Sequence, residues 1–324
     1  MARTIGVTGS TGFVGRHTVR ALVDRGWKVR ALLRDPIKAR RFLPSGPIDW
    51  VEGDVFDAAS LQRFVRGCDA LVHTIGIRRE FPPEVTFQRM HPGATRRLLA
   101  AAAEGGVSRF IHISALGTRP EAPTAYHRSK HDSEALVRAS GLEWTILRPS
   151  IIHGPDGEFM QMVKAWCLGR AQPFIFIPYF ARLERREGSR LPMPALASAR
   201  LQPVSVDDVA QAVVASLENR RAIGEVYALT GPEALDWPTL LRAVRDALPL
   251  GDKHKPVVPI PAPFARAAAE FARILGLGAL LPFGPSEPVM ASEDNTAPLD
   301  KVAAHLALST RPFTPTMRQY AAQI

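Results

Sequence analysis

Cysteine and long apolar runs are scarce in this chain, and no His/Cys group is spaced like a zinc site. Two cysteines, Cys68 and Cys167, cannot build a disulfide framework, and no structural metal is expected. The longest apolar stretch, residues 274–283, is about half of the ~20 residues that a membrane-spanning helix requires. The first residues lack the apolar core and cleavage site of a signal peptide. We therefore expect a cytoplasmic protein without a transmembrane segment.

Neither the composition nor the charge points to nucleic acid. The chain has 324 residues, of which 46% are hydrophobic and 22% charged, as in ordinary globular proteins. Its net charge of +10 comes from basic residues, mostly arginine, that are scattered without a long basic run. The length suits one large α/β unit with an appendage, or two modest domains. The composition does not distinguish a monomer from a dimer.

Short β-branched segments alternate with helical patterns through the first half of the sequence. The expected strands are residues 4–8, 29–33, 49–52, 70–74, 110–114 and 144–148, and the expected helices are residues 12–25, 58–66, 93–104 and 126–139. A glycine lies just past each of these helices, which is a common stop signal. This alternation predicts an α/β fold with a Rossmann-type, doubly wound parallel sheet covered on both faces by helices.

The regular alternation stops near residue 155. Residues 155–200 look irregular and proline-rich, whereas a helix over 204–218 and a strand over 225–230 return to the earlier pattern. We therefore predict a dinucleotide-binding domain interleaved with a smaller α/β lobe for a substrate or a partner. The predicted division is residues 1–154 with 201–230 for the first, and residues 155–200 with 231–324 for the second.

The most specific local signal is a glycine-rich turn between the first strand and the first helix. Gly9 would allow the tight turn, Gly12 the close approach of a pyrophosphate, and Gly15 the close packing of helix on strand. The amino end of the helix would add oriented N–H groups. The predicted cofactor contacts in this turn are Gly9, Ser10, Thr11, Gly12, Phe13, Val14 and Gly15.

The end of the second strand favours NADP(H) over NAD(H). An NAD site usually places an acid there for the ribose hydroxyls, but this strand ends in Leu33 and is followed by Arg34. The planar guanidinium of Arg34 can pair with a 2′-phosphate, and Ser10 or Thr11 could add a hydroxyl. In the alternative, Arg34 is a solvated loop residue and Asp35 takes the place of the acid, so NAD(H) remains possible.

These motifs together resemble the extended and atypical short-chain dehydrogenase/reductases, a superfamily that includes the NAD(P)-dependent epimerases and dehydratases. The resemblance covers about residues 4–260 and is carried by the sequences around Asp54, Thr74, Tyr126 and Pro149. The segment 113–117 is similar to an atypical branch that includes bacterial NAD(P)-binding proteins and the nucleotide-binding accessory subunit of mitochondrial complex I. The resemblance implies further cofactor contacts at Asp54, Val55, Thr74, Ile75, Gly76, Ser114, Tyr126, Lys130, Pro149, Ser150, Ile151 and Ile152.

Tyr126 and Lys130 form the candidate catalytic pair. They are four residues apart in a predicted helix and so share one face. An ammonium beside a phenol favours the ionised form, and would bring the pKa of Tyr126 down from about 10 toward neutrality. In the family a hydroxyl polarises the substrate carbonyl, but its position is Ala115 here. Ser114, the third candidate catalytic residue, or Thr118 would have to replace that hydroxyl.

Nothing in the second lobe identifies a substrate. The apolar segment 173–180 is interpreted as a lid or a docking surface, because it would otherwise expose a large patch. It is followed by Arg182, Arg185, Arg186 and Arg190. Apolar residues within 159–166 are interpreted as core, and if some of them line a cleft, the ligand is an apolar small molecule.

A further apolar stretch covers residues 263–283. Its apolar face is interrupted by Arg266, Glu270 and Arg273, which suits a helix docked on the same lobe. A peripheral contact with a membrane surface is the alternative.

Two classes of function remain open. The first is an oxidoreductase or epimerase that transfers hydride between NADP(H) and an apolar small molecule, with Tyr126 as the acid/base. The second is a catalytically silent NADP(H)-binding protein of a larger, respiratory-type complex, which the resemblance to the complex I subunit implies. The absence of a hydroxyl at Ala115 keeps the second class open.

Overall fold

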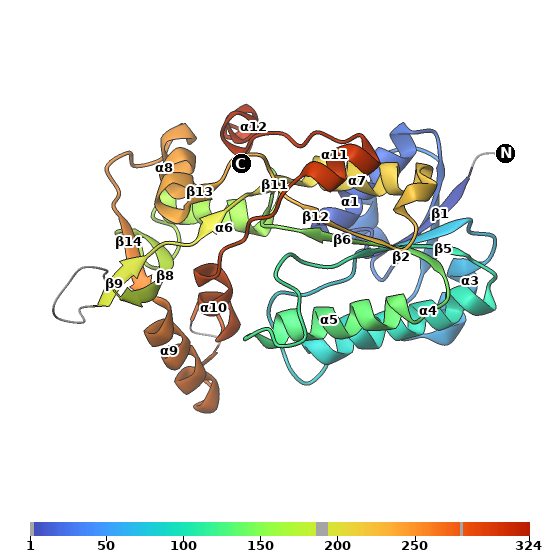
Figure 1. The fold of residues 1–324 in the computed structure, drawn as a ribbon, viewed down its shortest axis with the longest axis horizontal. Coiled ribbons are helices and arrows are strands. Elements are labelled where there is room, and N and C mark those ends of the chain that lie inside the picture. The colour runs from blue at the N-terminus through green and yellow to red at the C-terminus, as the bar shows by residue number, and fades with distance from the viewer. Residues whose placement is uncertain (1–2, 186–193, 279–280) are drawn as a thin grey trace. The chain divides into compact units, whose positions relative to one another are not determined.

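The computed structural model describes residues 3–185, 194–278 and 281–324, which form two compact units (Figure 1). The first unit contains residues 1–149, 206–229 and 298–310, and the second contains residues 150–205, 230–297 and 311–324. The sequence analysis had placed residues 298–310 in the second lobe. They join the first unit because helix α11, Asp300–Leu306, packs against strand β12 and helix α7.

A seven-stranded parallel sheet is the centre of the first unit. Its order is β12-β6-β5-β4-β1-β2-β3, and every pair of neighbours is parallel. The strands are β1 Thr4–Thr8, β2 Lys28–Leu33, β3 Ile48–Glu52, β4 Ala70–His73, β5 Arg109–Ile113, β6 Glu143–Pro149 and β12 Glu225–Leu229. The predicted Rossmann-type α/β fold is therefore confirmed.

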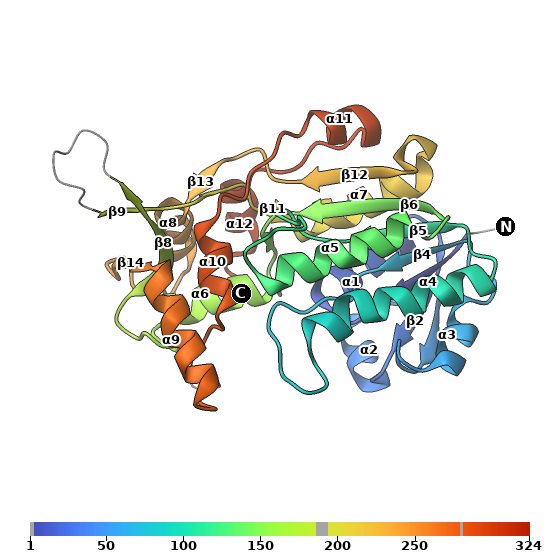
Figure 2. The same ribbon diagram turned by 60° about the horizontal axis from the view of Figure 1, so that its bottom comes forward.

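Helices cover both faces of this sheet. Figure 2 shows α3, α4 and α5 on one face, while α1 and α7 pack against each other on the other face. These helices are α1 Phe13–Asp24, α3 Ala58–Val65, α4 Ala94–Glu104, α5 Ala125–Arg138 and α7 Val206–Glu218. Because both faces are covered, the central strands are almost entirely buried, and the core includes Phe64, Leu71, Leu98 and Phe110.

Two helical segments in the first half of the chain were not predicted. Helix α2, Pro36–Phe42, begins at a proline and is capped by the Asp35 carboxylate, which accepts hydrogen bonds from the N–H groups of Ile37 and Lys38. A π-helical turn, η1 Arg89–Gly93, precedes α4 and contains Pro92.

The second unit is built from small sheets and helices. Its strands are β7 Ile152–His153 with β11 Val204–Ser205, β10 Arg200–Leu201 with β13 Leu235–Asp236, and β14 Val257–Pro261 with β8 Ile177–Arg185 and β9 Pro194–Ala197. Its helices are α6 Glu158–Cys167, α8 Trp237–Ala247, α9 Ala262–Ile274, α10 Ser286–Ser292 and α12 Phe313–Tyr320.

The prediction that residues 155–200 are irregular is wrong. This range contains α6 and the nine-residue strand β8, in which Pro178 masks the strand pattern in the sequence. The interpretation of residues 159–166 as core is confirmed, since Met160 and Val163 are fully buried.

The apolar segment 173–180 divides into two parts. Ile177 is fully buried and Phe180 packs edge-on against Phe283, with ring centroids 4.9 Å apart, so the second part is core. Phe174 and Ile175 are exposed. The sequence-predicted Arg186 and Arg190 lie outside the described residues.

Candidate functional site

The parallel strands bring the predicted site residues of the first unit to one edge of the sheet. Gly9, Arg34, Thr74 and Ser114 each follow directly on the carboxyl end of a strand, β1, β2, β4 and β5 respectively. The strand order reverses between β1 and β4, which is where ligands bind in doubly wound sheets.

The glycine-rich turn joins β1 to α1 as predicted. Gly9 has φ +68°, a left-handed conformation that favours glycine, and its carbonyl accepts a hydrogen bond from the Gly12 N–H at 2.9 Å. A Cβ at Gly15 would lie 2.0 Å from the Gly9 oxygen, so only glycine fits there. No side chain caps the amino end of α1 at Gly12, which leaves its first N–H groups available to a phosphate. This backbone fits the pyrophosphate of a dinucleotide.

The side chains of the turn are engaged in building it. The Ser10 hydroxyl is buried and donates to the Leu32 carbonyl at 3.1 Å, which ties the turn to β2. The Thr74 hydroxyl donates to the Thr8 carbonyl at 2.8 Å, which ties β4 to β1. The sequence analysis expected Ser10 or Thr11 to join Arg34 in binding the 2′-phosphate. The Ser10 hydroxyl already donates its proton to the Leu32 carbonyl.

Arg34 stands at the end of β2 with its side chain 75% exposed. Its closest ionic neighbour is Asp54, at 3.7 Å between Nη1 and Oδ2. Asp54 also accepts the Phe56 N–H at 2.9 Å, while Val55 is buried. The alternative assigns the ribose hydroxyls to Asp35, but the Oδ1 atom of this carboxylate is already used to cap α2.

Tyr126 lies in the first turn of α5 and is surrounded by rings. Phe87, His91 and His127 each contact it edge-on, with centroids 5.8, 5.5 and 5.1 Å away. Among the described residues its hydroxyl has no hydrogen-bond partner. The aromatic neighbours therefore fix the ring and leave the hydroxyl available to a ligand.

Lys130 lies one turn further along α5 and is almost completely buried. Its ammonium donates to the Ile113 carbonyl at the end of β5, at 3.0 Å. A Cβ at Gly76 would be 3.1 Å from Lys130 Nζ, so glycine keeps the ammonium next to open backbone. Burial lowers the pKa of Lys130 to about 8.

The expected lowering of the Tyr126 pKa is wrong for this structure. Desolvation raises the pKa of Tyr126 to about 12, because the ring environment disfavours the phenolate. The Lys130 ammonium is bonded to the Ile113 carbonyl instead of the phenol. Tyr126 is consequently a protonated phenol at neutral pH, which suits donation of a proton.

Ser114 is part of a different network. Its hydroxyl donates to Glu134 Oε1 at 2.6 Å, and Arg148 binds the same carboxylate through two hydrogen bonds of 2.8 and 2.6 Å. Arg138 adds a third contact at 3.2 Å. Thr118, the other hydroxyl considered, is also buried, 3.4 Å from Ser114. For Ser114 to polarise a carbonyl, its bond to Glu134 would have to open.

Two residues of this region were missed by the sequence analysis. His91 lies beside Tyr126, and its ring bonds to the Ser129 hydroxyl at 2.8 Å and to the backbone of Ile77 at 3.1 Å. Pro92 inside a helical pattern was the available signal, because it marks irregular backbone. Glu134 continues the four-residue spacing of Tyr126 and Lys130 on α5.

The last predicted contacts divide between the units. Pro149 ends β6 in the first unit, whereas Ser150, Ile151 and Ile152 belong to the second. There the Ser150 hydroxyl donates to the Gln202 carbonyl, and Ile152 pairs with Val204 in the β7–β11 ladder.

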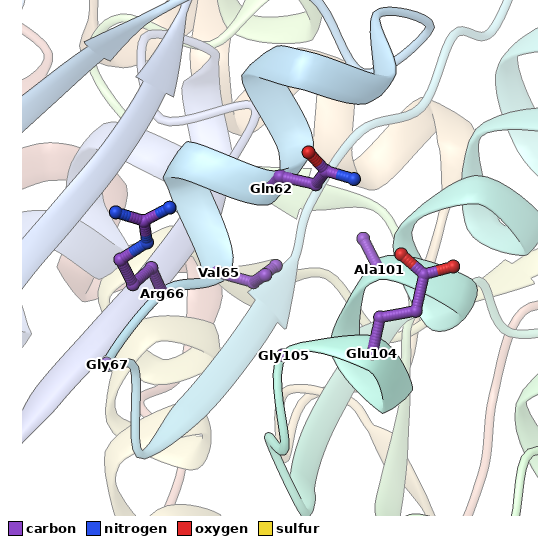
Figure 3. A pocket seen from close by; sticks show the side chains of 7 residues that line it. All are labelled: Gln62, Val65, Arg66, Gly67, Ala101, Glu104 and Gly105. Atoms are coloured by element: carbon purple, nitrogen blue, oxygen red, sulfur yellow. The ribbon is translucent and has the colours of Figure 1, made fainter.

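A hollow of about 370 Å³ lies at the opposite, amino-terminal edge of the sheet (Figure 3). It is lined where α3 and α4 end, by Gln62, Val65, Arg66, Gly67, Ala101, Glu104 and Gly105. None of the predicted site residues borders it.

No group of three or more His, Cys, Asp or Glu side chains in the described ranges could hold a metal ion. In the same ranges, no helix combines the length and apolarity needed to cross a bilayer.

Comparisons with known proteins identify the family of this chain. Residues 9–164 match a family model described as NAD(P)H-binding. The chain is 30% identical over 230 residues to a (4-alkanoyl-5-oxo-2,5-dihydrofuran-3-yl)methyl phosphate reductase of Streptomyces griseus, covering 71% of this chain and 68% of the relative. It is 36% identical over 152 residues to a ceramide reductase of Caulobacter vibrioides, covering 47% of each chain.

A mitochondrial protein is also similar. Subunit 9 of the NADH dehydrogenase (ubiquinone) 1 alpha subcomplex of Mus musculus is 27% identical over 262 residues, 79% of this chain and 63% of the relative. The chain thus spans about half of the ceramide reductase and under two thirds of the mitochondrial subunit. The fold matches the crystal structure of gox2253, with a TM-score of 0.70, 24% identity and coverage of 99% and 96%. The chain belongs to the NAD(P)H-binding family of atypical short-chain dehydrogenase/reductases and epimerases.

Proposed function

We propose that this protein is an NADP(H)-dependent reductase of a carbonyl group on an apolar small molecule. The observation that carries the proposal is the pairing of Tyr126, whose hydroxyl is free and protonated, with the buried Lys130 on the same face of α5. Both lie in the unit that holds the glycine-rich turn. A role limited to holding a dinucleotide does not require a tyrosine and a lysine at this spacing.

In this proposal, separate residues bind the cofactor and transfer the proton. The glycine-rich turn and the amino end of α1 would hold the pyrophosphate, and Arg34 the 2′-phosphate. When bound, NADPH supplies the hydride to the carbonyl carbon. The Tyr126 hydroxyl donates its proton to the carbonyl oxygen, so that the carbonyl becomes an alcohol. The Lys130 ammonium offsets the negative charge that develops on Tyr126 as the proton leaves.

The raised pKa of Tyr126 suits the role of a proton donor. With a pKa of about 12 the phenol is protonated across the physiological range, so it acts as an acid without prior activation. Oxidation of an alcohol would need the phenolate, which the surrounding rings disfavour. Reduction is therefore the direction that we propose. Reductases among the similar proteins support this class, and the ceramide reductase supports an apolar substrate.

A second candidate is a catalytically silent NADP(H)-binding protein of a larger assembly. The engagement of Ser114 with Glu134, together with Ala115 at the usual hydroxyl position, favours it, because no second donor then faces the carbonyl oxygen. The similarity to the mitochondrial NADH dehydrogenase subunit also supports it.

The substitution Tyr126→Phe distinguishes the two candidates. It removes the proton donor and keeps the ring, so reduction of a panel of long-chain aldehydes and ketones should fall by about 10²-fold or more. The affinity for NADPH should stay nearly unchanged. The rate is measured as NADPH consumption and the affinity by calorimetry.

Tyr227→Phe is the matched control, because it removes the same oxygen from a tyrosine of β12 that bonds to His305. It should leave the rate intact. Full activity of Tyr126→Phe would contradict the catalytic assignment. NADPH binding by the unmodified protein without consumption on any member of the panel would favour the silent candidate.

A further inference from the structure

Helix α9, Ala262–Ile274, is turned the opposite way from what its sequence predicts. A helix docked on its own lobe should bury its large apolar side chains. Here the buried residues are the alanines Ala262, Ala265 and Ala269. The helix is therefore docked on its own lobe, as predicted, but through its alanines, and its large apolar side chains are left uncovered.

The large apolar side chains of this region face solvent. Phe264 is 68% exposed, Phe271 65% and Ile274 69%, and the exposure continues past the end of the helix. Phe264, Phe271 and Leu275 are spaced seven and four residues apart, which places them on one side of a helix. We call this set the α9 apolar stripe, consisting of Phe264, Phe271, Ile274, Leu275 and Leu277.

The packing of the second unit explains why the stripe is left uncovered. α9 packs on strands β8 and β14 and on helix α10. Small alanines allow this close approach and leave no room for phenyl rings between the elements. Figure 2 shows α9 extending away from the three-stranded sheet, with α10 alongside it.

The charged residues of α9 lie on a different side of the helix from the two phenylalanines, since Arg266 is turned by about 140° from Phe271 at 3.6 residues per turn. Arg273 forms an ion pair with Glu270, at 2.6 Å between Nη2 and Oε1. Arg266 is exposed and forms no hydrogen bond or salt bridge with any residue in the described ranges. The hydrogen bond from Arg273, together with the charge of Arg266, lowers the pKa of Glu270, so this side of the helix carries one positive charge in excess.

We propose that the α9 apolar stripe docks this protein on the surface of an anionic lipid bilayer. A single helix with phenylalanines and leucines on one side and arginines on another has the composition of an interfacial helix, which lies in the headgroup region. The stripe is carried by one helix that extends away from the three-stranded sheet (Figure 2). The net charge of +10 and the excess positive charge of α9 draw the chain toward anionic lipid. This inference does not depend on the cofactor or on catalysis.

The test is flotation of the full chain with vesicles. The unmodified protein should bind phosphatidylcholine vesicles that contain phosphatidylglycerol, and bind vesicles of phosphatidylcholine alone more weakly. Phe264→Ser with Phe271→Ser should weaken binding by roughly tenfold or more for each phenyl ring removed. Because both rings are exposed, the thermal stability should remain unchanged. Leu250→Ser is the control, since Leu250 is 82% exposed in the same unit but outside the stripe.

A labelling experiment tests insertion directly. Cys68 and Cys167 are buried, and burial raises the pKa of each thiol to about 11, so both react slowly. Leu275→Cys can therefore be labelled selectively with an environment-sensitive dye. Its emission should shift to the blue when anionic vesicles are added, whereas the same dye at Leu250→Cys should not shift.

Two outcomes would overturn the proposal. One is equal vesicle binding by the double serine variant and the unmodified protein. The other is the absence of vesicle binding together with a dimer that the double variant abolishes, as seen by sedimentation velocity. The second result would assign the stripe to an interface between two copies.

Discussion

Arg34 is the residue on which the choice of dinucleotide depends. It is exposed at the end of β2, while the neighbouring Asp35 has its carboxylate committed to the cap of α2. A guanidinium that is mostly solvated before binding keeps its five donors available to a phosphate. The ion pair with Asp54, at 3.7 Å, is weak in this exposed position and so opposes binding little.

We expect Arg34→Ala to weaken NADPH binding about tenfold and to leave NADH binding nearly unchanged, because only NADPH carries the 2′-phosphate. Calorimetric titration of both dinucleotides measures this. Arg20→Ala, an exposed arginine on α1, makes the same change in net charge and should affect neither. Equal affinities of the unmodified protein for NADPH and NADH would contradict the NADP(H) preference.

The glycine-rich turn decides the cofactor site at the level of elements. At Gly15, helix α1 packs so closely on the turn after β1 that a methyl group would clash with the Gly9 carbonyl oxygen. Gly12 is different, since a Cβ there would be 3.1 Å from the same oxygen, a contact that small shifts relieve. The two glycines therefore serve packing and ligand approach respectively.

Alanine substitutions should separate these two roles. Gly15→Ala should lower the free energy of unfolding by about 1–3 kcal/mol, as overpacking usually does, and also impair dinucleotide binding. Gly12→Ala should leave stability nearly unchanged and still reduce NADPH affinity, because its methyl group would stand where the pyrophosphate approaches. Chemical denaturation and calorimetry measure the two effects. If both variants lost stability equally, the division of roles would be wrong.

Buried imidazoles affect the stability of the whole molecule. His73 and His112 stack in the central sheet, with centroids 5.5 Å apart, and both nitrogens of His112 have no hydrogen-bond partner. Burial lowers the pKa of His73 to about 3 and of His91 to about 2, and it lowers the pKa of His112 well below its ordinary value. These rings are neutral in the folded protein and become charged in the unfolded chain below about pH 6.5.

The sign of the pH dependence follows from proton binding. Between about pH 3 and 6.5 the unfolded chain binds more protons than the folded protein, so stability falls as the pH is lowered. Each such histidine contributes about 1.4 kcal/mol per pH unit in this range. His112→Phe should remove one such contribution and keep the stack on His73. Urea unfolding at several pH values measures the slope.

The control for this experiment is His254→Phe, at an exposed position in the second unit. It should leave the slope unchanged. We also expect His112→Phe to be no less stable than the unmodified protein at pH 7, because it removes a buried polar ring without partners. An unchanged slope in His112→Phe would show that this histidine is not neutral in the folded state.

The sequence by itself determined the parallel sheet, the glycine-rich turn, and the places of Arg34, Tyr126 and Lys130, because these depend on short-range patterns. Strand and helix alternation, glycine spacing and a four-residue interval on a helix are all local. Only the tertiary structure decided that Ser114 bonds to Glu134, that β8 forms despite Pro178, and that the pKa of Tyr126 rises to about 12. It also decided that α9 buries its alanines and exposes its phenylalanines. Each of these outcomes depends on which distant residues become neighbours, and a periodic pattern shows that a helix has two faces without showing which one is covered.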